Sequence, residues 1–148
     1  MDIRELQDRI AQTVERADAP VVGPMDDLYP FRFASAVFVP PFMDAVMRVA
    51  LGTDDDGSAH TRLTALAGVL EEVFSSGDEG IADALAIRLV HTRLCAQPDL
   101  LSAAWPYLGE RTRRVAGKFL RLAEECERRE AAARGQALPR QPTAGPTS

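Results

Sequence analysis

Apolar side chains recur every three or four residues along most of the chain, and short polar breaks separate the runs. This spacing places the apolar positions on one face of an α-helix. It predicts an outer helix near residues 3–14 and further helices near 41–51, 58–74, 79–96, 98–105 and 110–133. We therefore expect an all-α fold, as a compact bundle or a short solenoid-like stack of five or six helices.

The junction over residues 75–79, Ser-Ser-Gly-Asp-Glu, separates two long apolar runs by only a few residues. Breaks this short join antiparallel helices. Ser76 and Glu79 also have the Ser-x-x-Glu spacing of a capping box, which satisfies orphan N–H groups of a new helix. The run over 81–94 is apolar almost all round, which is typical of a central helix. The sequence thus predicts a helical hairpin at the centre of the domain.

Proline and glycine mark the other boundaries. Proline suits the first turn of a helix, so we expect one to begin near Pro41, after a short helical or extended piece that ends before Pro40. Gly52 closes this helix, and the polar turn that follows leaves Ser58 available to cap the next one. Residues 135–148 have the composition of a disordered tail. We expect a single helical domain over residues 1–134, followed by that tail.

Aromatic residues gather in the segment 29–42. They are Tyr29, Phe31, Phe33, Phe38 and Phe42. Large rings under a loop commonly fill a small core. The alternative is a partly exposed aromatic patch, which would mark an interface.

Composition narrows the class of protein. The chain has 148 residues, 46% of them hydrophobic and 26% charged, which is ordinary for a soluble domain. No apolar run approaches the ~20 residues of a membrane span, and residues 1–16 lack the apolar region of a signal peptide. Two cysteines are too few for a secreted disulfide framework. We expect a cytoplasmic bacterial protein, and the net charge of -5 disfavours nucleic acid and favours a basic partner.

The chain offers little candidate chemistry. Asp54, Asp55 and Asp56 precede Gly57, but an EF-hand in that register would place its first and last ligands on Gly52 and Leu63, which have no side-chain oxygen. His91 and Cys95 are four residues apart on a helix and are suitable zinc ligands, with His60 and Cys126 elsewhere. None of the compact Cys/His spacings of structural zinc sites is present. No nucleophile motif or phosphate-binding loop is found, so we expect neither an enzyme nor a cofactor.

Charge gathers at three places on the predicted surface. The first is the acidic turn of Asp54, Asp55 and Asp56, and the second is an acidic corner of Glu71, Glu72, Asp78 and Glu79. The third is a basic stripe of Arg111, Arg114, Lys118 and Arg121, opposite the apolar face of the last helix. A solvated face is the favoured interpretation of this stripe, and contact with an acidic partner or a phosphate backbone is the alternative.

The chain resembles a group of small, uncharacterised helical bacterial proteins in four places: residues 42–51, the helix over 63–74, the Ser-Ser-Gly-Asp-Glu junction over 75–79, and the stretch Trp-Pro-Tyr-Leu-Gly-Glu-Arg-Thr over 105–112. The resemblance covers about residues 38–122. It implies an all-α fold and an immunity-type or other binding role, with no catalytic residues to carry over.

As function we expect a non-enzymatic cytoplasmic module that binds another protein, such as an immunity or antitoxin-like inhibitor of a basic partner. The candidate contact residues are Asp54, Asp55, Asp56, Glu71, Glu72, Asp78, Glu79, Tyr29, Phe31 and Phe33. The alternative is a small-molecule or metal-binding domain with a pocket near His91 and Cys95. A nucleic-acid-associated regulator is the third hypothesis, and it depends on the basic stripe alone.

Overall fold

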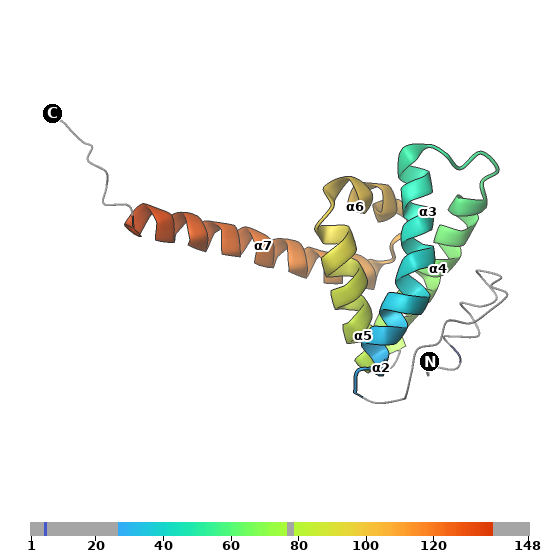
Figure 1. Ribbon diagram of the computed structural model, residues 1–148, viewed down its shortest axis with the longest axis horizontal. Coiled ribbons are helices and arrows are strands. Elements are labelled where there is room, and N and C mark those ends of the chain that lie inside the picture. The colour runs from blue at the N-terminus through green and yellow to red at the C-terminus, as the bar shows by residue number, and fades with distance from the viewer. Residues whose placement is uncertain (1–4, 6–26, 77–78, 138–148) are drawn as a thin grey trace. The chain divides into compact units, whose positions relative to one another are not determined.

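The computed structural model describes Glu5 and residues 27–76 and 79–137, and its regular structure there is entirely helical (Figure 1). In chain order the elements are α2 Tyr29–Phe33, η1 Ala34–Phe38, α3 Val39–Leu51, α4 Ser58–Ser76, α5 Glu79–Leu85, η2 Ala86–Cys95, α6 Pro98–Ala104, η3 Trp105–Tyr107 and α7 Glu110–Ala137. Here η1 and η2 are π-helical and η3 is a 3-10 turn. The predicted all-α fold is confirmed.

The chain forms two units, which are considered separately. The first ends at Ala116 and the second begins at Gly117, inside α7, whereas the sequence suggests one domain to residue 134. Helix α7 itself continues to Ala137, past its predicted end near residue 133. The remaining tail, 138–148, lies outside the described residues, as does the predicted outer helix near 3–14 except for Glu5.

The predicted break at Pro40 is wrong, because α2, η1 and α3 form one continuous helix from Tyr29 to Leu51. Proline lacks an N–H and its ring clashes with the carbonyl four residues earlier, so two prolines normally end an α-helix. Here the carbonyls four residues before the two prolines belong to the wider π-helical turn over Ala34–Phe38, which leaves the α-helical spacing where the rings would clash.

This continuous helix is also longer and more apolar than the sequence pattern suggests. By length and composition it could cross a membrane, with a mean hydropathy of 1.4 over its most apolar stretch. Half of that stretch is buried inside the structure, and the core helix of a folded domain has the same properties. The aromatic segment explains the burial, because Phe33, Phe38 and Phe42 are all fully buried.

The core of the first unit is built around α3, which packs against α4 on one side and α6 on another. Leu63, Leu66 and Leu70 of α4 and Leu85, Leu89 and Leu94 of the α5–η2 helix complete it. Helix α4 ends at Ser76 and α5 begins at Glu79, so the predicted helix junction is confirmed in position. The capping box predicted there pairs Ser76 with Glu79, and the Ser76 side chain lies outside the described side chains. The prediction that the helix after the junction is central and buried on nearly all sides is wrong, because Ile87, Arg88 and His91 are exposed to solvent.

Gly52 ends α3 in the left-handed conformation, at φ 69°. Its own N–H donates to the carbonyl of Val49 at 3.2 Å, and the N–H of Thr53 donates to that of Arg48 at 3.0 Å, so two carbonyls of the last turn are satisfied. Gly68, in contrast, lies inside α4, where an added Cβ would meet no atom within 4 Å.

The two glycines give opposite predictions. Gly68→Ala should raise the free energy of unfolding by roughly 0.5–1 kcal/mol, because alanine restricts the unfolded chain and favours helix. Gly52→Ala should lower it by about 1 kcal/mol, because a side chain is strained at positive φ. Urea denaturation measures both changes, and stabilisation by Gly52→Ala would contradict the left-handed cap.

Candidate functional site

The acidic turn is the N-terminal cap of α4. The Asp54 carboxylate accepts the backbone N–H of Ala59 at 2.8 Å and that of His60 at 2.9 Å. Asp56 accepts the N–H of Ser58 at 2.9 Å, and bonds from Ser58 lower the pKa of the Asp56 carboxyl. The first N–H groups of a helix lack intrahelical partners and favour acceptors with negative charge. Two of the three aspartates are therefore structural, and Ser58 is the first helical residue rather than the cap.

Glu71, from the predicted acidic corner, caps a second helix at a distance of forty residues in sequence. One carboxylate oxygen accepts the N–H of Arg111 at 2.9 Å. The other accepts both the N–H and the hydroxyl of Thr112, each at 2.9 Å. These N–H groups belong to the first turn of α7, so a carboxylate of α4 provides the cap that the chain before α7 lacks.

Gly109 makes this contact feasible. It is the residue just before α7, and a Cβ there would overlap the carboxyl group of Glu71. Thr112 is fully buried, so its hydroxyl and N–H have no access to water as an alternative partner. Burial by itself raises the pKa of Glu71, but the bonds from Arg111 and Thr112 outweigh it and hold the pKa below its usual value.

The segment from Trp105 to Gly109 is fixed at further points. The carbonyl of Trp105 accepts two bonds from the Arg113 guanidinium, at 2.9 and 3.3 Å, and the same guanidinium lies over the indole ring. His60 Nδ1 is 2.8 Å from the hydroxyl of Tyr107, and the two rings meet edge to face. Residues 105–112, on which part of the resemblance rests, thus form the packing junction between the start of α7 and α4.

These contacts reduce the predicted acidic surface. Asp54, Asp56 and Glu71 serve as caps, while Asp55, Glu72 and Glu79 remain exposed. Asp78 lies outside the described residues. The candidate acidic surface is therefore smaller than the sequence suggests.

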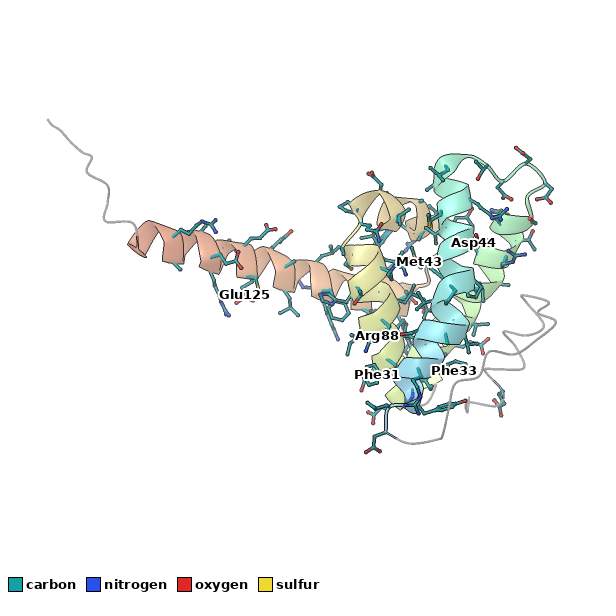
Figure 2. The ribbon with its side chains drawn as sticks, viewed as in Figure 1. Phe31, Phe33, Met43, Asp44, Arg88 and Glu125 are labelled. Atoms are coloured by element: carbon teal, nitrogen blue, oxygen red, sulfur yellow. The ribbon has the colours of Figure 1, made fainter. Side chains whose placement is uncertain are left out.

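The aromatic segment is mainly part of the core. Tyr29 and Phe33 are buried, which removes them from the candidate partner surface, because their rings fill the space between α2 and its neighbours. Phe31 is half-buried, and the guanidinium of Arg88 lies 5.4 Å from its ring centre (Figure 2). This cation–π contact covers the remaining exposed ring with a charged group.

His91 and Cys95, which the alternative hypothesis places beside a pocket, lie near the end of η2. Cys95 is half-buried, its Sγ donates a weak bond to the carbonyl of Ala116 at 3.7 Å, and burial raises the pKa of its thiol. A raised pKa disfavours the thiolate that zinc or nucleophilic chemistry needs. Among the described residues no group of three His, Cys, Asp or Glu side chains could hold a metal ion.

The basic stripe lies on α7, and its four members are exposed. One of them, Arg114, is paired with Glu110 one turn earlier. The second unit holds a similar pair, Glu125 with Arg129, as the i, i+4 spacing predicts. Exposed pairs of this kind contribute little to stability.

A groove that the sequence analysis missed lies between the last turn of α3 and the start of α6. Its volume is 680 Å³, and its lining residues are Met47, Ala50, Leu51, Gln97, Pro98, Asp99, Leu100 and Ala103. Met47 and Leu51 are 43% and 72% exposed. One signal was available: residues 41–51 are apolar on more sides than a single core contact requires.

Comparison with known proteins finds no matching family model, curated protein or solved structure.

The Glu71 cap predicts a pH-dependent stability difference. Glu71→Gln should lower the free energy of unfolding by about 2 kcal/mol at neutral pH, because an amide cannot accept all three bonds and leaves a buried donor unsatisfied. A lowered folded-state pKa means that this contribution is complete above the ordinary carboxyl pKa of ~4.3 and is lost as the pH falls through the folded-state value.

Denaturation of the wild type and Glu71→Gln between neutral pH and about pH 3 measures this effect. The two curves should converge at the acid end. Glu127→Gln, at an exposed carboxylate of α7, is the control and should follow the wild type. A constant gap at all pH values would contradict the charged cap.

Asp54 and Asp55 provide a matched pair of neighbours. Asp54→Ala should cost about 1–2 kcal/mol of stability, because the N–H groups of Ala59 and His60 lose their acceptor. Asp55 is exposed, so Asp55→Ala should change stability by less than about 0.5 kcal/mol. Thermal unfolding followed by circular dichroism compares them, and equal effects of the two substitutions would refute the capping assignment.

Proposed function

We propose that the protein is a non-enzymatic protein-binding module whose α3–α6 groove receives apolar side chains of a partner. One observation carries this proposal: Met47 and Leu51, both large and apolar, are exposed on one turn of α3 and line the same groove. Apolar side chains scattered singly over a surface are ordinary, but a cluster at a concave site is typical of an interface.

The use of the polar groups supports a binding role rather than catalysis. Asp54, Asp56 and Glu71 act as hydrogen-bond acceptors for helix ends, and His60 is held by Tyr107. The Cys95 thiol, with its raised pKa, is a poor nucleophile. None of these groups forms the nucleophile and base arrangement that covalent catalysis needs.

The finer proposal is an immunity or antitoxin-like inhibitor of a basic partner in the cytoplasm. The net charge of -5 favours rapid association with a basic surface. Both cysteines are free, which fits a reducing compartment. Exposed carboxylates outside the caps include Asp55, Glu79 and Asp99.

Copurification from the native host tests the module with a matched control. Full-length wild type, Leu51→Gln and Ile87→Gln are recovered at low salt, and bound proteins are identified by mass spectrometry. Ile87 is also a large, exposed apolar residue, at 42% against 72% for Leu51, but it lies on η2 and does not line the groove.

We expect one stoichiometric partner with the wild type and with Ile87→Gln, and at least a tenfold smaller yield with Leu51→Gln, because a central apolar anchor typically costs more than 1 kcal/mol when lost. The absence of any stoichiometric partner would sink the proposal. Equal recovery with Leu51→Gln would place binding elsewhere on the molecule.

A further inference from the structure

The groove between α3 and α6 has a one-sided charge. Among its lining residues only Asp99 is ionisable, and no cation lines it. Asp99 lies in the first turn of α6 and is exposed. A carboxylate beside apolar side chains favours a guest that carries a positive charge next to its own apolar surface.

The two helix ends at the groove have opposite dipoles. The last turn of α3 places partial negative charge there and the first turn of α6 partial positive charge, so the charge preference of the groove rests on the Asp99 carboxylate. The cation in this turn, Arg48, does not line the groove, and its Nε is bonded to Asp44 at 3.0 Å. Helix α3 therefore supplies apolar contact without a guanidinium in the groove that would compete for Asp99.

The lining also indicates the conformation of the guest. An extended segment needs partners for its backbone N–H and C=O groups, as an edge strand would provide. The described residues contain no strand, and the amide of Gln97, the other polar side chain in the lining, already donates to the Arg93 carbonyl at 3.2 Å. A helix satisfies its own backbone, so it is the guest that an apolar groove between two helices accommodates best.

We propose that the groove binds an amphipathic helix of a partner protein, with apolar side chains against Met47 and Leu51 and a lysine or arginine facing Asp99. This inference rests on the proposed binding function and specifies its partner. The apolar contacts supply most of the affinity. The pair with Asp99 lies at an exposed rim, so it sets charge preference and salt dependence more than total affinity.

The test uses three synthetic helical peptides, each about five turns long, with the same leucine face and with Lys, Gln or Glu at the two positions that flank it. Binding to the full-length protein is measured by fluorescence anisotropy at about 0.05 M and 0.5 M salt. The variants are Asp99→Asn, Leu51→Gln and, as a matched carboxylate control, Asp83→Asn. Asp83 is exposed on α5 and does not line the groove.

We expect the Lys peptide to bind about tenfold more tightly than the Glu peptide at low salt and about equally at high salt. Asp99→Asn should reduce this preference to about threefold or less, because a rim pair of this kind contributes a factor of a few. Asp83→Asn should leave it unchanged, and Leu51→Gln should weaken every peptide at least tenfold.

Equal binding of the three peptides, lost in Leu51→Gln, would overturn the cationic guest while leaving an apolar protein-binding groove intact. Failure of all three to bind the wild type would overturn the helical guest, and the copurification experiment judges the binding function independently. Self-association of the protein that disappears in Leu51→Gln would overturn the proposal in favour of a second copy of the chain. Tighter binding of the Glu peptide would refute the assigned charge.

Discussion

The carboxylate of Glu71 is the contact on which the arrangement of the first unit depends most. It accepts three hydrogen bonds from Arg111 and Thr112 and so joins the C-terminal half of α4 to the first turn of α7. The approach is so close that position 109 has no room for a side chain. Because Thr112 is buried, the bonds cannot be exchanged for water without cost. The Trp105–Gly109 segment is thereby held between two helices rather than forming a free linker.

Helices α4 and α7 begin in the same way. Each follows a glycine, Gly57 or Gly109, that offers no capping side chain, and each receives a carboxylate from elsewhere on the N–H groups of its second and third residues. Asp54 comes from the preceding turn and Glu71 from a distant helix. Acidic residues that the sequence suggests are free surface charges thus accept hydrogen bonds from the first N–H groups of these helices. The net charge of -5 is unchanged by these contacts, but the oxygens of the capping carboxylates are already bonded within the fold.

The sequence predicts what depends on local spacing and fails where contacts are remote. Apolar periodicity places the end of α4, the start of α5 and the start of α7 within a residue or two. It misses the helix through Pro40, because the π turn that permits it is a property of the packed backbone. It also misreads Glu71, since the donors lie forty residues away, and the groove, since exposure of Leu51 depends on where α6 lies.

The stability of the fold and the proposed binding therefore depend on different residues. The capping acids and buried rings hold the first unit together, so their substitution changes stability and would alter binding only indirectly. Leu51 is 72% exposed, and a polar replacement there removes little buried surface from the core. An apolar side chain in that position gains free energy only when something covers it. Among the described residues, the groove brings the exposed side chains of Met47 and Leu51 together at a concave site, and the partner that we propose would supply the burial that the fold itself does not.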